Sequence, residues 1–597
     1  MNFAQKRIRI VVILLHIFSV GLSLCLPANA QDDFRPLVQQ AIKAGAHRVV
    51  IEPGTYRLAP DARFDRGVVF PIRDAHDLDI VADGVTLICT RRARAIDFDG
   101  SHDVTLSGLT IDYEPLTFTQ GTITAIAADH QSFTVKIHDG YPSGKAYDRA
   151  ELIDQHTRFP KKGVEWRFYN AKPVWSDATP DVVQVQFKDA DKSVAIGDFL
   201  TLSAAHEEGM APHGVDVGKA SRITLQNITV HASPGWGIIG DGYSDNSYLG
   251  CKVILGPKPK GATQERLLTT TWDALGGGNR VENCTVEDAG DDAWSIVLNS
   301  PMIVLKSEGH SAILRLDLGN QFNRLVVGNH IKQSINGPQA VVSARRLVTL
   351  EQAALAPETL QKIEAAKKAP PRPAWDQDNP WTLNGDLVQV DFEGASPFEV
   401  GQLVYADELL NRGFIFRGNR IKTQGRVLIK GGNGLIENNL IEGSYGLCVD
   451  LLDWSPLSAQ MGLRHLIIWG NTFRDVGGFG EKGLPWPRWS GGVYLVAARG
   501  DDFLPSGNYN DILLENNLFE NITVRNLIIT SANGVVLRSN RFVRPQMNEQ
   551  SPSLVLAQST NVKFEGNTIS NFGTLQKAVS IAPTVSNVSG TETTLIR

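Results

Sequence analysis

The sequence is poor in sulfur, with only 5 cysteines and 5 methionines among its 597 residues. Cys25 falls in the apolar N-terminal segment, and no C-x-x-C pair occurs anywhere. The other four cysteines are scattered along the chain, at Cys89, Cys251, Cys284 and Cys448. This spacing excludes a cysteine zinc site and the dense disulfide framework of a small secreted scaffold. We therefore expect four buried thiols that pack as small apolar side chains.

The chain also lacks an excess of positive charge. Its 58 Lys and Arg face 64 Asp and Glu, a formal net charge of −6. Residues 1–30 hold three basic and no acidic side chains, so without them 55 basic groups face 64 acidic ones, a net charge of −9. Nucleic acid and anionic membranes both reward a basic face. We expect neither as a main partner, whereas neutral carbohydrate is compatible with this charge.

The first thirty residues have the pattern of a bacterial signal peptide. Lys6, Arg7 and Arg9 precede the apolar run 10–26, and Ala28-Asn29-Ala30 supplies the small-x-small cleavage site. The alternative is a membrane anchor, for which the apolar run is short. We expect cleavage after Ala30, a secreted or periplasmic protein, and no membrane contact afterwards.

A short unit recurs along most of the chain: two or three apolar residues, a polar pair that ends in Asn, and a further hydrophobic step. Six copies lie at 414–421, 435–441, 467–473, 513–519, 535–542 and 562–569, and earlier copies lie at 104–111, 223–230 and 281–286. The asparagines that end the polar pairs of these six copies are 20, 32, 46, 23 and 27 residues apart. Short β-branched segments at this spacing indicate a solenoid of strands. We predict an all-β, right-handed parallel β-helix, in which stacked Asn amides bond from coil to coil.

Two stretches lack the recurring unit, and their sequences predict inserted antiparallel, barrel-like β segments. The second of them also contains a helix candidate, residues 350–368. The predicted organisation is a signal peptide at 1–30, N-terminal coils at 31–114, a first insert at 115–205, coils at 206–296, a second insert at 297–410, and C-terminal coils at 411–597. We expect a monomer or a homodimer.

The chemistry is expected in the stretch 287–296, which contains the adjacent pair Asp291 and Asp292. Neighbouring carboxylates repel and so raise one another's pKa. This repulsion is useful in a site where one carboxyl group stays protonated as an acid while another acts as a base. Asp273 precedes Asp291 by 18 residues, about one short coil. Because neighbouring coils stack roughly 4.8 Å apart, Asp273 is expected beside the pair. Three carboxylates together are typical of a glycosidase.

Two tryptophans flank these carboxylates, Trp272 and Trp294. Aromatic faces pack against the apolar face of a sugar ring, so we assign both to substrate binding. The alternative is that they fill the solenoid core, and a lone G-D-D is an ordinary turn in most proteins. Further candidate contacts to the sugar are His213, Arg266, Asp453 and Trp454. The alternative for His213 is a buried histidine with its hydrogen bonds satisfied, and the alternative for Arg266 is a solvated side chain on the flank of the solenoid.

The sequence resembles the α-1,3-galactosidases of glycoside hydrolase family 110, which are secreted parallel β-helix enzymes with inserted β-barrel segments. The resemblance is carried by residues 51–56, 109–115, 120–123, 266–274, 283–293 and 419–471. It departs from the family after Asp292, where Trp294 and Ser295 stand in place of an Asn and a His, and at the short turn 275–278.

The resemblance implies an inverting exo-α-galactosidase that needs no metal or organic cofactor and acts on galactose-containing oligo- or polysaccharide. One of Asp291 and Asp292 would protonate the leaving oxygen, and the other, or Asp273, would activate water. The working carboxyl groups would be about 6.5–9.5 Å apart.

Three other functions remain open from the sequence. A polygalacturonase-like pectin hydrolase would use the Asp pair together with Gly309-His310 and Arg420-Ile421-Lys422. A polysaccharide lyase would want a basic residue and often Ca²⁺, but no D-x-D-x-D-G loop is present. A non-catalytic carbohydrate-binding solenoid would use exposed aromatic residues such as those in 486–489.

Overall fold

A computed structural model of the chain describes residues 33–161, 167–169, 171–187, 194–204, 212–298, 301–316, 324–368, 381, 385–451, 461–477, 491–499, 502–523, 525–545, 553–571, 578–590 and 594–596. The signal-peptide prediction lies outside these residues. No helix of the described part has the length and apolarity needed to cross a membrane.

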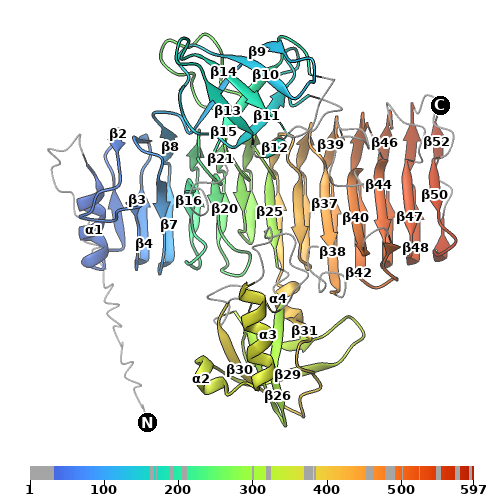
Figure 1. Cartoon of the computed structure of the whole chain (residues 1–597). Coiled ribbons are helices and arrows are strands. Elements are labelled where there is room, and N and C mark those ends of the chain that lie inside the picture. The colour runs from blue at the N-terminus through green and yellow to red at the C-terminus, as the bar shows by residue number, and fades with distance from the viewer. Residues whose placement is uncertain are drawn as a thin grey trace, which may run out of the picture.

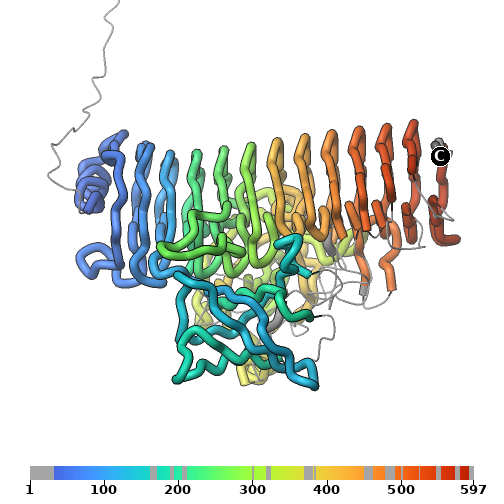
Figure 2. Tube along the Cα trace, turned by 90° about the horizontal axis from the view of Figure 1, so that it is seen from above, coloured from blue at the N-terminus to red at the C-terminus, as the bar shows by residue number. Residues whose placement is uncertain are grey.

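The body of the molecule is an elongated parallel β-helix, as Figures 1 and 2 show. Three parallel sheets run along its whole length. The first sheet runs from β1 (Arg48–Val50) to β51 (Ser586–Ser589), the second from β2 (Gly54–Leu58) to β52 (Thr594–Ile596), and the third from β3 (Val68–Pro71) to β50 (Val579–Ile581). Each coil contributes one strand to each sheet. The predicted fold class, a parallel β-helix with antiparallel inserts, is confirmed.

Strand side chains alternate between the solenoid interior and its outer surface. The inward rows stack like with like: the rings of Phe473, Phe519 and Phe542 follow one another at centroid distances of 4.9 and 4.8 Å. The four predicted thiols are all free and buried, which confirms that interpretation. Two of them, Cys251 and Cys284, donate to backbone carbonyls of the preceding coil.

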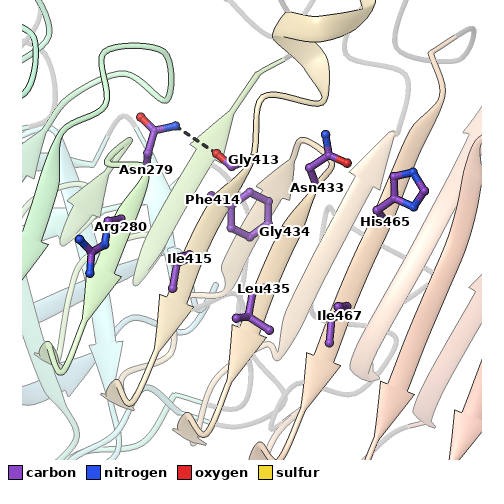
Figure 3. A pocket seen from close by; sticks show the side chains of 10 residues that line it. All are labelled: Asn279, Arg280, Gly413, Phe414, Ile415, Asn433, Gly434, Leu435, His465 and Ile467. Carbon is purple, nitrogen blue, oxygen red and sulfur yellow. Dashed lines mark hydrogen bonds between the residues drawn. The ribbon is translucent and has the colours of Figure 1, made fainter.

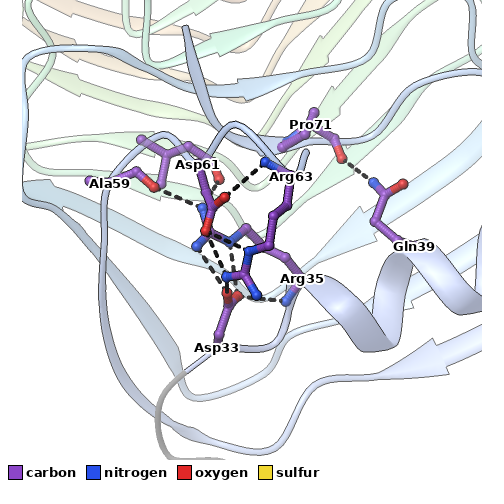
Figure 4. Close-up of polar contacts among 8 residues, drawn as sticks. Asp33, Arg35, Gln39, Ala59, Asp61, Arg63 and Pro71 are labelled. Atoms are coloured by element: carbon purple, nitrogen blue, oxygen red, sulfur yellow. Dashed lines mark hydrogen bonds and ion pairs between the residues drawn. The ribbon is translucent and has the colours of Figure 1, made fainter. Parts of the chain in front are cut away.

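The N-terminal end of the solenoid is covered by α1 (Arg35–Lys43), which shields the first coil from water. Phe34 packs edge-on against Tyr56 and Phe70. Arg35 is buried, pairs with Asp33, and donates to two carbonyl oxygens of the first coil (Figure 4). These contacts hold the helix as a cap that the sequence pattern did not reveal.

Six asparagines form a continuous ladder inside one corner of the solenoid. Each side-chain amide donates to the next residue's Oδ1 at 2.9–3.0 Å, through Asn419, Asn439, Asn471, Asn517, Asn540 and Asn567. The predicted coil-to-coil amide bonds are thus confirmed. At this corner the residue with a left-handed backbone is the one before each ladder asparagine, such as Gly470 (φ 67°) before Asn471.

Replacing Asn471 by Ala should destabilise the protein by about 3 kcal/mol or more, because the backbone and side-chain donors of Asn439 and the carbonyl of Ile436 lose a buried partner. Urea unfolding measures this change. Asn510→Ala, which removes a half-buried amide bonded to the nearby Gly507 carbonyl, is the matched control and should cost less than 1 kcal/mol. Equal losses in the two variants would contradict a structural role for the ladder.

The first insert leaves the solenoid after β8 (Thr110–Tyr113) and returns before β16 (Val215–Asp216), at the corner between the second and third sheets. Its seven antiparallel strands are β9 (Phe118–Ile126), β10 (Ser132–Ile137), β11 (Arg149–Ile153), β12 (Arg167–Tyr169), β13 (Lys172–Trp175), β14 (Val182–Gln186) and β15 (Phe199–Ser203). Their order is β12-β11-β15-β9-β10-β14-β13.

The second insert leaves after β25 (Trp294–Val297) and returns before β32 (Phe414–Arg417), at the corner between the third and first sheets. It is a closed barrel of β26 (Met302–Glu308), β27 (Ser311–Leu316), β28 (His330–Lys332), β29 (Gln339–Leu347), β30 (Leu387–Phe392) and β31 (Leu403–Ala406). The two inserts therefore stand at opposite edges of the third sheet: Figure 1 shows the first above the solenoid and the second below it, and in Figure 2, seen from above, both lie on one long side.

The helix predicted over residues 350–368 is two helices, α2 (Leu350–Ala353) and α3 (Pro357–Lys368). Ala354 has a left-handed backbone (φ 43°), which ends α2, and Pro357 begins α3, where its missing N–H costs nothing. A further short helix, α4 (Asp407–Leu410), leads back to the solenoid.

Candidate active site

Asp273 and Asp292 occupy equivalent places in adjacent coils of the third sheet. They precede β22 (Leu275–Gly276) and β25, which pair in register with Leu275 opposite Trp294. The Ala274 amide donates to the Asp292 carbonyl at 2.9 Å, so the two aspartates stack at the start of their strands. One oxygen from each of Asp273, Asp291 and Asp292 lies within 4.8 Å of the others. The structure thus brings the three predicted carboxylates together.

This spacing is shorter than the 6.5–9.5 Å between carboxyl groups that the family resemblance implies. The physical reason is that two of the three residues are neighbours in the chain and the third is one coil away, where the ladder repeat is about 4.8 Å. The nearest oxygens of the three groups are therefore too close together for the arrangement in which a water molecule lies between a well-separated acid and base.

The three carboxyl groups have different surroundings. Asp273 and Asp292 are buried, each 6% exposed, whereas Asp291 is half-buried. The Ser295 hydroxyl donates to Asp273 Oδ2 at 2.8 Å, and the Arg426 guanidinium donates from Nε to Asp292 Oδ1 at 2.9 Å. Burial first, and then the charges of Asp292 and Asp291, raise the pKa of Asp273 well above its ordinary value. These surroundings favour the protonated form of Asp273.

Arg149, on β11 of the first insert, is a residue of this corner that the sequence did not single out. It is fully buried and donates to the carbonyl oxygens of Thr271 and Gly290, which precede Asp273 and Asp291. Its guanidinium lies 4.9 Å from the Trp272 ring centroid and 3.2 Å from a carboxylate oxygen of Glu151. The first insert is therefore anchored on the backbone that carries the carboxylates.

Asp288 is a further titratable group near this corner. Burial and the charge of Glu287 raise its pKa to about 7, although Lys422 and Arg158 partly offset them. The unfolded chain loses this proton near pH 4, so between pH 4 and 7 the folded state binds more protons and its stability falls as pH rises.

Asp288→Asn removes this penalty, and asparagine suits the left-handed backbone of position 288 (φ 42°). We expect the variant to be more stable than the wild type by about 1 to 4 kcal/mol at pH 8 and equally stable at pH 4. Urea titrations at the two pH values measure this difference. A stabilisation that does not change with pH would contradict it.

Several predicted sugar contacts lie elsewhere in the structure. Trp294 is 0% exposed and stacks on Phe416 at 4.5 Å inside the solenoid, because it shares the inward phase of β25 with Ile296. Trp294 therefore fills the core and does not face a sugar. Trp272 is half-buried beside Arg149.

The two predicted basic contacts are also internal. Arg266 is 4% exposed and forms a bidentate ion pair with Asp112 at 2.8 Å, so it joins two coils of the solenoid. His213 is 3% exposed, and its ring accepts from the Trp236 amide at 3.3 Å. Burial lowers the pKa of His213 to about 4. Asp453, Trp454 and the aromatic segment 486–489 lie outside the described residues.

The three aspartates are also where a metal ion would bind in the described part of the chain. Ca²⁺ takes six to eight oxygen ligands. Here Ser295 and Arg426 already donate to two of the carboxylates, and the guanidinium places a positive charge at the cluster. The donor set therefore fits a proton-transfer site better than a calcium site.

The polygalacturonase-like arrangement is only half assembled. The second insert loops out between coils, so β33 (Arg420–Lys422) does pair with β24 (Thr285–Glu287) in the coil of the Asp pair. Gly309-His310, however, forms the turn between β26 and β27 of the barrel. The basic strand thus reaches the coil of the Asp pair, whereas the histidine stays in the insert.

A hollow of about 520 Å³ lies on a different sheet from the carboxylates. Figure 3 shows Ile415, Leu435 and Ile467 side by side on three neighbouring strands of the first sheet. Its lining is mainly apolar and includes no carboxylate. This hollow does not belong to the candidate active site.

No protein-family model matches the chain, and no curated protein sequence matches it significantly. Among solved structures, it is similar to the catalytic unit of a family 87 α-1,3-glucanase from Streptomyces thermodiastaticus, with 11% identity and a TM-score of 0.37 over 96% of this chain and 71% of that one. It is similar to the family 28 exopolygalacturonase of Yersinia enterocolitica, with 12% identity and a TM-score of 0.36 over 93% and 74%.

A surface adhesin of Streptococcus pneumoniae, PfbA, is similar to the chain at 11% identity, with a TM-score of 0.31 over 95% of this chain and 88% of that one. One architecture can host unrelated functions. Similarity at this level assigns none of these activities to the chain, and the resemblance to family 110 stays a prediction.

Proposed function

We propose that the protein is a secreted glycoside hydrolase that releases terminal α-galactosyl units, with Asp273, Asp291 and Asp292 as its catalytic residues. The observation that carries the proposal is that three carboxyl groups meet within 4.8 Å and that burial and the two neighbouring carboxylates raise the pKa of one of them, Asp273. Glycoside hydrolysis needs both a protonated acid for the leaving oxygen and a carboxylate base for the attacking water.

Asp273 is the general acid in this proposal. The Ser295 hydroxyl donates to its Oδ2, which leaves Oδ1 to carry the proton toward the glycosidic oxygen. A raised pKa lets a carboxylic acid donate at neutral pH. The family resemblance gives the role of acid to Asp291 or Asp292 instead; the burial of Asp273 favours the new assignment.

Asp291 and Asp292 together hold and activate the water. Oxygens within 4.8 Å can each accept one hydrogen of a single water placed about 2.8 Å from both. The Arg426 guanidinium donates to Asp292 Oδ1 and fixes the orientation of that carboxylate. Direct attack by this water inverts the configuration at the anomeric carbon.

The outer face of the third sheet supports action at a chain end. Leu428 stands opposite Ser295 in the next coil, and from there the outward row continues with Cys448 and Tyr494. These three residues are at most 5% exposed and belong to an apolar cluster on that face. A substrate therefore meets an apolar surface one coil beyond the carboxylates, which favours removal of terminal units.

Hydrolysis of a panel of aryl glycosides by the wild type and by Asp292→Asn tests this function. We expect release of the aryl group from the α-galactoside, little from other α-hexosides, and loss of turnover in the variant. The exposed Asp103→Asn, on the first sheet, is the control and should retain full activity. Cleavage of uronic-acid polymers alone would favour the pectin-hydrolase alternative, and binding without turnover would favour a carbohydrate-binding solenoid.

Removal of divalent metal distinguishes a hydrolase from a calcium-dependent lyase. Because Arg426 and Ser295 occupy oxygens of the cluster, we expect EDTA treatment to change the hydrolysis rate by less than twofold. Loss of activity that Ca²⁺ restores, with an unsaturated product absorbing in the ultraviolet, would contradict the hydrolase proposal.

A further inference from the structure

A network of charged side chains covers the outer face of the third sheet on the N-terminal side of the carboxylates. Asp97, at the end of β6 (Arg94–Asp97), stands opposite Asp216 in the next coil. Both side chains point outward, since their neighbours Ile96 and Val215 are 0% exposed. Arg94 bridges the two carboxylates at 3.5 and 3.0 Å, and Arg73 bonds Asp97 at 2.8 Å.

The network lies in the same outward row as Ser295, whose hydroxyl donates to Asp273. Asp216 stands opposite Ile239 of β19 (Ile238–Ile239), whose strand pairs with β22, and Gly276 of β22 stands opposite Ser295. Three strand steps of about 4.8 Å separate Asp216 from Ser295, a span of about 14 Å. This is the reach of a short oligosaccharide chain.

The two directions along this row differ. Toward the C-terminus, the row is apolar and buried from Leu428 to Ile528. Toward the N-terminus, the side chains of Arg73, Arg94 and Asp216 keep 41%, 32% and 18% of their surface exposed. A glycan whose terminal unit sits at the carboxylates can therefore extend along this side, toward the network.

We propose that Arg73, Arg94 and Asp216 form a binding site for the neutral sugar units that follow the cleaved terminal unit. Carboxylates accept from sugar hydroxyls and guanidinium groups donate to them, so Arg–Asp pairs match vicinal hydroxyl groups. Both arginines are paired with aspartates, so neither offers an unpaired cation to a uronic acid. The site therefore takes neutral hexosyl units, and its assignment as a leaving-group site rests on the proposed function.

The test compares kcat/KM on an α-galactosyl oligosaccharide and on an aryl α-galactoside in Arg94→Ala. The aryl substrate does not reach the network, so we expect less than a twofold change with it and a loss of tenfold or more with the oligosaccharide. Arg222→Ala is the matched control: Arg222 pairs bidentately with Asp103 on the first sheet, away from the row. It should leave both values unchanged.

Equal losses on the two substrates, or none on either, would overturn the binding site while leaving the hydrolase proposal intact. If Arg94→Ala fails to fold, the more exposed Arg73→Ala takes its place in the same comparison. If the wild type cleaves neither substrate, the proposed function fails, and calorimetric binding of the oligosaccharide still decides the site: weaker binding by tenfold in Arg94→Ala supports it, and unchanged binding contradicts it.

Discussion

Replacing Asp273 by Asn is expected to lower kcat by about 10²- to 10⁴-fold without unfolding the protein. Asparagine has the same shape and still accepts from Ser295, but it has no proton to give to the leaving oxygen. It also removes a buried carboxyl group whose charged form is disfavoured by burial and by Asp292 and Asp291. The measurement is kcat on an α-galactoside with an alkyl leaving group, with thermal unfolding of the variant as the check on its fold.

The pH profile separates an acid from a residue that only shapes the site. The wild type should lose activity on the alkaline side as Asp273 gives up its proton. The Ser295 hydroxyl bond lowers the pKa of Asp273, so Ser295→Ala should raise that pKa and move the alkaline limb to higher pH. An unmoved limb in Ser295→Ala, or a full rate in Asp273→Asn, would contradict the assignment of Asp273 as the acid.

Replacing Arg149 by Ala should cost about 3 to 5 kcal/mol of stability and most of the activity. The change removes the buried ion pair with the 3% exposed Glu151 and the donors that bond the carbonyls of Thr271 and Gly290. Those carbonyls belong to the segments that lead into Asp273 and Asp291. A shift of an ångström in these segments alters proton transfer and water placement.

A double variant distinguishes positioning from stability alone. Arg149→Ala with Glu151→Ala removes both charges, so it should recover part of the unfolding free energy, measured in urea, and leave kcat low. Recovery of kcat together with stability would show that Arg149 acts only through the fold. Arg149→Lys, which keeps the charge but not the two-pronged geometry, should fall between the wild type and Arg149→Ala.

The solenoid and the meeting of the carboxylates were predictable because both depend on local periodicity. The apolar units and their asparagines repeat along the chain, and the offset between Asp273 and Asp292 is close to one coil. The inward position of Trp294 was also predictable, because Trp294 and Ile296 are two residues apart in β25 and their side chains point to the same side of the strand. The assignment to a sugar contact overlooked that alternation.

Other features depend on contacts between distant segments and left no local signal. Arg149 lies 122 and 141 residues from the carbonyls it bonds, and Arg266 lies 154 residues from Asp112. Which arginine of an antiparallel insert meets the solenoid depends on how the insert docks at its corner. The same holds for α1, whose role as a cap follows from the first coil beneath it.

Proton NMR of the first sugar released from an aryl α-galactoside tests the central claim most directly. The account predicts β-galactose as the initial product, because a water held by Asp291 and Asp292 attacks while Asp273 donates its proton. Initial α-galactose would show a carboxylate nucleophile and contradict that arrangement. No release of galactose at enzyme concentrations that give complete turnover with a known α-galactosidase would contradict the proposed function itself.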